Sequence, residues 1–201
     1  MWRYGAVLTW LVVLLSVGCV GDEIEESVGP DEINAGSESD DDCPWDHLQA
    51  NDCTLDCEQG QWPEVYRASE AAVVEAINER RLNGEECGDE WHEPVDPLEV
   101  DPVLREASRC HSVDMALEGE LAHEGTDGRE AEQRAVDAGY GSEYVGENLA
   151  SGGQTPPVVV EQWVESEGHC RNLMHEDYQE TAVGVVSYER RIYFTQKFGR
   201  P

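Results

Sequence analysis

Residues 102–118 are predicted to form a helix that is buried on two sides. Asp101 can cap its first turn, and Pro102 suits the first helical position. One helical face about 100° wide collects Leu104, Ala107, Ser108, His111 and Met115, and a second stripe collects Val103, Cys110 and Leu117. We therefore expect this helix to pack against two neighbours, with His111 in the middle of a buried face.

Three further helices are predicted from apolar periodicity and from start and stop signals, over residues 66–83, 127–139 and 155–168. The first has its stop at Asn83-Gly84. A capping box formed by Asp127 and Glu130 begins the second, and Gly168 is expected to end the third.

Two strands are predicted at the C-terminal end of the chain. Residues 182–188 are rich in Val, and residues 192–198 alternate in polarity; Glu189-Arg190 would form the turn between them. Neither turn residue favours the left-handed backbone of a tight hairpin. Helices followed by antiparallel strands predict an α+β domain, a three-layer α/β/α sandwich with a central antiparallel sheet.

Residues 1–19 are predicted to be a signal peptide. Arg3 supplies a positive end, and the apolar stretch over residues 6–17 is too short to span a bilayer. The stretch ends in Leu-Ser-Val-Gly-Cys, which resembles a bacterial lipobox in which the Cys19 thiol receives a diacylglycerol. Ordinary cleavage near Gly18 is the alternative. Either way, we expect a secreted or cell-envelope protein outside the cytoplasm.

Residues 20–42 are predicted to be an acidic disordered tether. This stretch holds ten acidic residues and no Lys or Arg, and it has too little apolar surface to fold alone. Its self-repelling charge would keep a lipid-anchored domain extended from the membrane. We expect residues 43–62 to be a cysteine-bearing extension of a single domain that occupies residues 63–201.

The charge balance excludes two kinds of partner. The formal net charge is −31, from 44 acidic and 13 basic residues. Nucleic acid binding needs clustered cations that face phosphates, and electrostatic adhesion to anionic lipid needs the same. We therefore expect a soluble monomer that meets the membrane only through its lipid anchor.

The cysteines predict disulfides. Without Cys19 the chain keeps six of its seven cysteines, an even number in an exported protein. A zinc–thiolate site at Cys53 and Cys57 is the rival interpretation, but such sites are uncommon in exported proteins. The pairing of Cys43, Cys53, Cys57 and Cys87 cannot be chosen from sequence.

Histidine and carboxylate side chains recur beside small residues in the second half of the chain, as His111, His123, Glu147 and His169. Neutral imidazole is a ligand for zinc or copper, and a carboxylate can bind the metal or orient the imidazole. The same groups could do general acid–base work. A single histidine on an apolar face is more often a hydrogen-bonded core residue, and the spacing lacks the HExxH pattern of a helical zinc protease.

As an ordered set, several short segments resemble the CAP superfamily of cysteine-rich secretory, antigen 5 and pathogenesis-related 1 proteins, in its bacterial form. These segments are INERR, ASRCHSVDMA, LAHEGTDG, GENLA, WVESEGHCRN and YFTQKFG, together with the Thr-Pro-Pro helix start. The resemblance covers about residues 63–201. It implies an α/β/α sandwich whose central cavity can hold a divalent cation such as zinc.

The resemblance also assigns residues to that cavity. The cavity histidines map to His111 and His169 and the acidic residue to Glu147, while His123 matches a further histidine of bacterial members. A second cavity glutamate would fall at Ser166, which has Glu165 beside it. Bacterial members commonly have a basic residue where this chain has Cys170; a paired change with Cys110 would explain the difference, so we expect a Cys110–Cys170 disulfide.

Three functions follow as hypotheses. The first is an exported, lipid-anchored binding module whose cavity holds a divalent cation through His111, His169 and Glu147. The second is a metal-assisted hydrolase or peptidase in which Glu147 would activate water. The third is a structural envelope protein whose polar cavity only braces the core, because a fold does not by itself imply a function.

Overall fold

The computed structural model describes residues 62–201. In this part of the chain the helices are α2 (Glu64–Asn83), α3 (Pro102–Glu118), α4 (Ala131–Asp137), α5 (Pro156–Glu165) and α6 (Glu167–Leu173). The strands are β1 (Glu85–Cys87), β2 (Glu90–His92), β3 (Glu99–Val100), β4 (Val145–Gly152), β5 (Glu180–Tyr188) and β6 (Arg191–Gly199). No helix among these is long and apolar enough to cross a membrane. The predicted signal peptide, the lipidation at Cys19 and the acidic tether lie outside the described residues.

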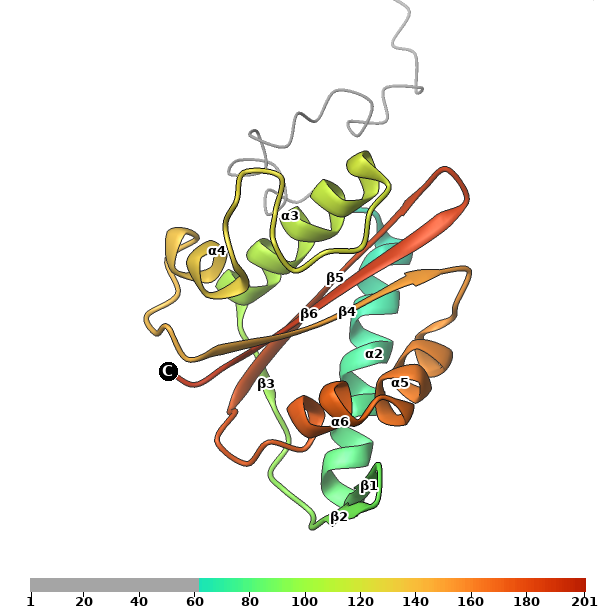
Figure 1. Cartoon of the computed structure of the whole chain (residues 1–201), viewed down its shortest axis with the longest axis vertical. Helices are drawn as coiled ribbons and strands as arrows, with labels where there is room; N and C mark the ends of the chain where they lie inside the picture. Colours follow the sequence, from blue (N-terminus) through green and yellow to red (C-terminus); the bar gives the residue numbers. More distant parts are fainter. Residues whose placement is uncertain (1–61) are drawn as a thin grey trace, which may run out of the picture. The chain divides into compact units, whose positions relative to one another are not determined.

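The central sheet has the strand order β3-β5-β6-β4 (Figure 1). Strand β6 pairs antiparallel with both β5 and β4, and the two-residue β3 pairs parallel with β5. Strands β1 and β2 form a separate two-stranded sheet. The two C-terminal strands were predicted, but β4 was not, because its Gly- and Asn-containing sequence has no clear alternation.

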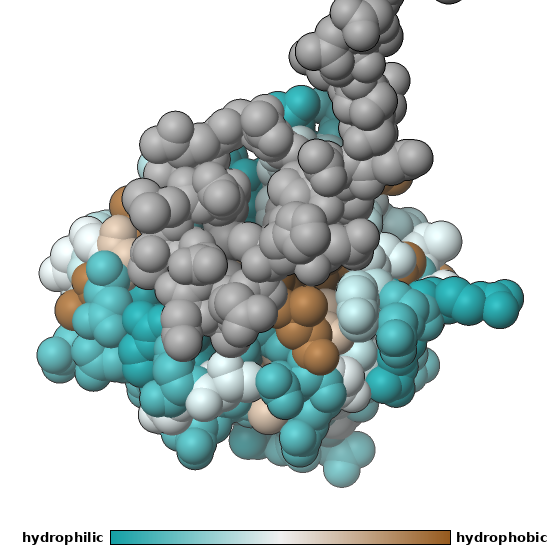
Figure 2. Space-filling model, turned by 90° about the horizontal axis from the view of Figure 1, so that it is seen from above, coloured by the Kyte–Doolittle hydropathy of each residue, from teal (hydrophilic) through white to brown (hydrophobic). Residues whose placement is uncertain are grey.

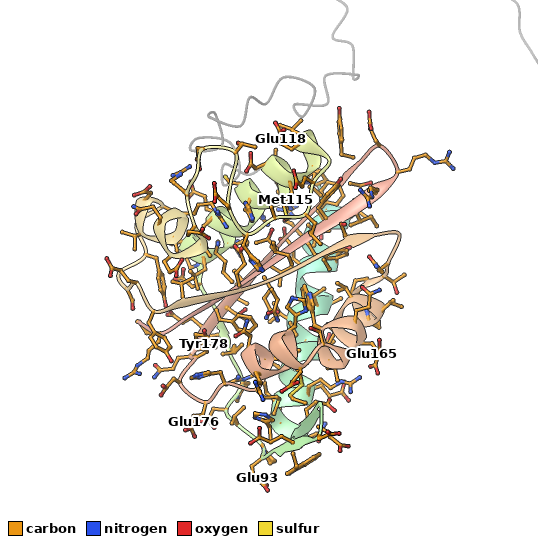
Figure 3. The ribbon with its side chains drawn as sticks, in the orientation of Figure 1. Glu93, Met115, Glu118, Glu165, Glu176 and Tyr178 are labelled. Atoms are coloured by element: carbon orange, nitrogen blue, oxygen red, sulfur yellow. A yellow bond between two sulfur atoms is a disulfide. The ribbon has the colours of Figure 1, made fainter. Side chains whose placement is uncertain are left out.

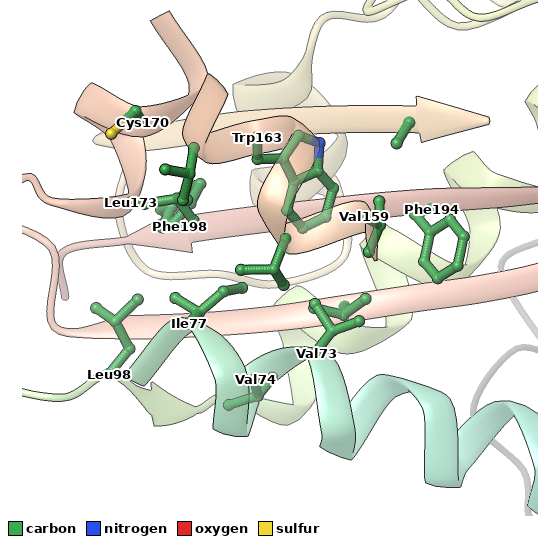
Figure 4. Close-up of a cluster of buried hydrophobic side chains, with 14 of the residues drawn as sticks. Val73, Val74, Ile77, Leu98, Val159, Trp163, Cys170, Leu173, Phe194 and Phe198 are labelled. Carbon is green, nitrogen blue, oxygen red and sulfur yellow. The ribbon is translucent and has the colours of Figure 1, made fainter. Parts of the chain in front are cut away.

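Helices cover both faces of the central sheet, as predicted. On strand β6, Phe194 and Phe198 contact a cluster built with α2, α5 and α6, whereas Tyr193 packs with residues of α3. Trp163 of α5 is almost fully buried in the first cluster, and its indole N–H donates to the carbonyl of Leu149 (Figure 4). The layers are thus α3 and α4, then the sheet, then α2, α5 and α6.

Helix α3 begins as the sequence predicts. Asp101 is its N-cap, and Oδ1 of Asp101 accepts from the backbone N–H of Leu104 at 2.7 Å. Pro102 occupies the first turn, and Gly119 ends the helix with a left-handed backbone. His111 is buried on this helix, as its place in the apolar stripe predicts.

Two other predicted helix limits are wrong. The capping box at Asp127 does not form: the Asp127 carboxylate accepts from the backbone N–H and guanidinium of Arg129, but residues 127–130 are not helical. Helix α4 therefore begins later, at Ala131. Gly168 does not stop the preceding helix either: α5 ends at Glu165, and Gly168 lies within the next helix, α6.

The turn between β5 and β6 is the tight hairpin that the sequence disfavours. Glu189 and Arg190 have φ angles of 45° and 68°, both in the left-handed region that favours glycine or asparagine. The strand register on both sides of the turn is continuous, from Tyr188 opposite Arg191 to Glu180 opposite Gly199. The long ladder therefore outweighs the local preference of the two turn residues.

The predicted Cys110–Cys170 disulfide is wrong. Cys170 is bonded to Cys87, which lies on β1, with a Cα–Cα distance of 5.4 Å. Cys110 is itself disulfide-bonded, but Cys170 is not its partner. Cys110 lies on α3, on one side of the sheet, and Cys170 lies on α6 in the opposite layer. The Cys87–Cys170 bond fastens the β1–β2 hairpin to α6.

Figure 2 shows hydrophilic side chains over most of the visible described surface, with few hydrophobic ones between them. The large hydrophobic side chains that are exposed come from several different elements: Val65, Leu82, Trp91, Val100, Leu121, Tyr144, Val158 and Tyr188.

Candidate functional site

The register of β4 on β6 places a buried ion pair at the centre of the candidate site. Glu147 lies directly opposite Lys197, and the Lys197 ammonium donates to Oε2 of Glu147 at 2.5 Å. Lys197 is fully buried and Glu147 is 7% exposed. Both side chains extend from the sheet towards the α3 and α4 layer, where their other partners lie.

Helix α4 supplies a second cation to the same carboxylate. Nη2 of Arg134 donates to Oε1 of Glu147 at 3.1 Å and to Oε2 at 3.0 Å. The other end of the guanidinium donates to the carbonyl of Arg129, which fixes the start of α4. Lys197 also donates to the carbonyl of Ala131, at 3.4 Å. The two cations therefore join the helix to the sheet through one carboxylate.

His123 completes the contacts of Glu147. Nδ1 of His123 lies 2.9 Å from Oε1 of Glu147. An ionised carboxylate only accepts hydrogen bonds, so Nδ1 must carry the proton. In the neutral ring, the lone pair of Nε2 is then available to a ligand. The ring is well placed for one, because the His123 side chain is 55% exposed.

His111 supports the segment that carries His123. Nε2 of His111 lies 2.9 Å from the carbonyl oxygen of Ala122, so Nε2 is the protonated nitrogen and donates this bond. Asp114, one turn further along α3, holds the same segment through the backbone N–H and hydroxyl of Thr126. Nε2 of His111 lies 3.8 Å from Oε1 of Glu147, and its buried Nδ1 has no hydrogen-bond partner in the described part of the chain.

The charges of the site control its protonation. Burial opposes ionisation of Glu147, but Lys197, the hydrogen bond from His123 and the nearby His111 and Arg134 outweigh it, so the pKa of Glu147 lies well below its ordinary value. Burial lowers the pKa of Lys197 to about 8, although Glu147 opposes the shift. The hydrogen bond to Glu147 raises the pKa of His123. Glu147 is therefore an anion held by cations at neutral pH.

The buried His111 predicts a pH dependence of stability. Burial lowers the pKa of His111 to about 4, from an ordinary value of 6.5. Between pH 6.5 and 4, His111 is therefore protonated in the unfolded chain but stays neutral in the folded chain. The contribution of His111 to the stability of the fold is fully present above pH 6.5 and is lost as the pH falls towards 4. The shift corresponds to about 3 kcal/mol in the free energy of unfolding.

A His111→Gln variant isolates this contribution, because glutamine can still donate to the carbonyl of Ala122 without titrating. Urea unfolding should be measured with a chelator present, at several pH values between 6.5 and 4. The free energy of unfolding should fall more steeply with decreasing pH for the native chain than for the variant. Equal slopes would contradict the assignment.

His169 approaches the site from the opposite layer, round the β4 edge of the sheet. It lies on α6, where its carbonyl accepts from the amide of Asn148 at 3.1 Å, and Asn172 donates to the Asn148 oxygen at 2.9 Å. Burial, and then the charge of His123, lower the pKa of His169, so the two side chains lie within electrostatic range of each other. No hydrogen bond to the His169 ring is present among residues 62–201. The amide of Asn148 thus joins β4 to α6.

Glu165, the further candidate cavity residue, does not join this group. It lies exposed at the end of α5, as Figure 3 shows. Across the described part of the chain, no three His, Cys, Asp or Glu side chains are arranged to hold a metal ion together. Glu147 does not fit as a metal ligand, because its oxygens are already bonded. The free Nε2 of His123 and the unbonded ring of His169 do fit.

Sequence reasoning missed Lys197 and Arg134. Buried lysine and arginine are rare, so charged residues are normally assigned to the surface. A signal was present for each: Lys197 shares one strand face with Tyr193 and Thr195, and Arg134 shares a helical face with Ala131. Both of those faces are buried.

The chain is similar in sequence to a known protein family. The model of the cysteine-rich secretory protein family (CAP) matches residues 74–198. The protein YkwD of Bacillus subtilis is 31% identical over 137 residues, which is 68% of this chain and 49% of YkwD. The chain therefore spans about half the length of that relative.

Two solved structures are similar in fold. An outer surface protein of Borrelia burgdorferi has a TM-score of 0.56 at 21% identity, over 65% of this chain and 90% of that protein. An extracellular protein of Bacillus anthracis that contains an SCP domain has a TM-score of 0.56 at 22% identity, over 71% of this chain and 45% of that one. At these identities the likeness concerns the fold alone.

Proposed function

Because the chain belongs to the cysteine-rich secretory protein (CAP) family, we propose that it is an exported binding module, held to a membrane by a lipid on Cys19, whose cavity binds a divalent cation such as zinc. Export is supported by the predicted signal peptide and by two proteins of the same fold that are described as an outer surface protein and an extracellular protein. The acidic stretch over residues 20–42 would serve as the tether.

One observation carries the cation proposal: the hydrogen bond from Nδ1 of His123 to Glu147. Metal-binding histidines commonly donate their other ring N–H to a carboxylate, which fixes the tautomer and makes the free nitrogen a better ligand. His123 has this arrangement, and its free nitrogen belongs to an exposed ring. Among residues 62–201, nothing forms a hydrogen bond to the ring of His169, so this imidazole and His123 would be the protein ligands.

This proposal changes the roles expected from the resemblance. Glu147 orients His123 instead of binding the metal, and His111 positions the segment around Ala122 instead of serving as a ligand. Two imidazoles leave the remaining positions on the cation open to water or to a donor atom of the molecule that the module binds.

The hydrolase alternative is weaker. It needs Glu147 to take a proton from water, and a general base works best with a pKa near the operating pH. Lys197, His123 and Arg134 hold the pKa of Glu147 far below that range despite its burial. The carboxylate is also withdrawn from solvent, since only 2% of the Glu147 side chain is exposed.

Equilibrium dialysis against zinc tests the proposal. The exported full chain should bind zinc at pH 7.5, and His123→Ala or His169→Ala should weaken binding at least about tenfold, because each removes a ligand. His175→Ala is the matched control, since this histidine follows α6 and its ring packs against Tyr144 and Tyr178 instead. Circular dichroism verifies that each variant is folded. Absence of zinc binding, or equal binding by all variants, would contradict the proposal.

A further inference from the structure

The location of Lys197 is unexpected for this chain. The sequence has 44 acidic residues, 13 basic residues and a single lysine. A lysine in so acidic a protein has many exposed partners, yet this one is fully buried within the sheet. Burial of an ammonium group is unfavourable unless the group is paired and hydrogen-bonded. Its partner is the carboxylate behind the candidate cation site.

The donors around Glu147 leave that carboxylate no free acceptor position. Oε2 accepts from Lys197 and from Arg134, and Oε1 accepts from Arg134 and from His123. An ionised carboxylate has about four lone-pair positions, so these four bonds use all of them. Two of the three donor side chains, Lys197 and Arg134, are cations at neutral pH. Their two positive charges exceed the single negative charge of Glu147, so the cluster of these side chains is net positive.

We propose that Lys197, together with Arg134, determines which cations the cavity accepts, by occupying the carboxylate that a metal would otherwise bind. The inference rests on the proposed function. With Glu147 occupied, the ligands that the described residues offer to an incoming cation are imidazole nitrogens, which suit zinc, copper and nickel. Manganese, magnesium and calcium prefer carboxylate and other oxygen ligands, so they are excluded.

Lys197 is the informative position to change. Methionine has a similar length and no charge, and in Lys197→Met the carboxylate of Glu147 still has Arg134 and His123 as partners. One of the two lone-pair positions of Oε2 is then released, and the positive charge that repels a cation falls by one. The released carboxylate can turn towards a cation that His123 and His169 hold.

The test measures zinc and manganese binding, each metal alone, by equilibrium dialysis of the full chain. The native chain should bind zinc and no manganese. Lys197→Met should bind zinc at least about tenfold more tightly and should bind manganese as well, because a carboxylate joins the ligand set. Glu147→Gln added to Lys197→Met should remove both gains. The ratio of zinc to manganese affinity is the decisive quantity, since a general loosening of the fold would not favour the oxygen-preferring metal.

A second variant covers the case in which Lys197→Met does not fold. Arg134→Met removes the other cation from Glu147 and leaves Lys197 in place, so it should also admit manganese. Thermal unfolding identifies which variants are folded.

The outcomes separate this inference from the proposed function. If the native chain binds zinc through His123 and His169 but neither variant changes its metal preference, the inference is wrong and the proposed function stands. If only the variants bind metal, both are wrong, because the native cavity then accepts no cation among which Lys197 and Arg134 could select. If no form binds metal, both are wrong.

Discussion

Replacement of Gly184 by alanine is expected to lower the free energy of unfolding by about 3 kcal/mol, because the added methyl group has no room. Gly184 lies on β5 where α3 crosses the sheet. A Cβ there would lie 2.4 Å from the backbone nitrogen of Arg109 and 2.4 Å from the carbonyl carbon of Ser108. These are backbone atoms of α3, so relief requires the whole helix to move away from the sheet.

Gly168→Ala is the matched control. A Cβ at Gly168 meets nothing within 4 Å, and the residue lies within helix α6, where alanine is favoured over glycine. Urea unfolding should therefore show a large loss for Gly184→Ala and an unchanged or slightly raised stability for Gly168→Ala. Losses of similar size in the two variants would contradict the close contact of α3 with β5.

Removal of the Cys87–Cys170 disulfide, by alanine at both positions, is expected to lower the free energy of unfolding by about 4 kcal/mol. The two cysteines are 83 residues apart, so the bond closes a long loop in the unfolded chain and restricts it strongly. Both residues are buried in the core cluster with α2 and α5. In addition, the bond holds α6, which carries His169.

The single variant Cys170→Ala serves as the internal comparison, since it breaks the same bond. Chemical unfolding should place the single and double variants within about 1 kcal/mol of each other and well below the native chain. A double variant as stable as the native chain would show that the bond does not constrain the fold.

The parts of the fold that could be predicted are those with local signals. Helix α3 has its cap at Asp101, its first-turn Pro102 and its apolar stripes within one stretch of sequence. The two C-terminal strands were predicted from their sequence pattern. Their hairpin forms although Glu189 and Arg190 are poor turn residues, because the strand pairing on both sides stabilises the structure by more than the turn costs. These features depend on neighbours in sequence.

The parts that could not be predicted depend on long-range contacts. Strand β4 forms because β6 pairs along its whole length, from Val145 opposite Gly199 to Gly152 opposite Ile192. The start of α6 depends on a backbone break at Ser166, where ψ is 110°. The Cys87 partner of Cys170 is set by the position of the β1–β2 hairpin. No local pattern contains this information.

The candidate site follows the same division. Sequence order identified the histidines and Glu147, but it could not tell which nitrogen of each ring is free. The hydrogen bond from Nε2 of His111 to Ala122 makes His111 a supporting residue, whereas the bond from Nδ1 of His123 leaves Nε2 available. Lys197 reaches Glu147 only because the strand register places the two opposite each other.

The most direct test of the account is the position of bound zinc in crystals of the full chain, located by anomalous diffraction. We expect the metal on Nε2 of His123 and on a ring nitrogen of His169, with Glu147 still bonded to Lys197 and Arg134. Zinc bound to the Glu147 carboxylate or to His111, or zinc found only on surface carboxylates, would contradict the account.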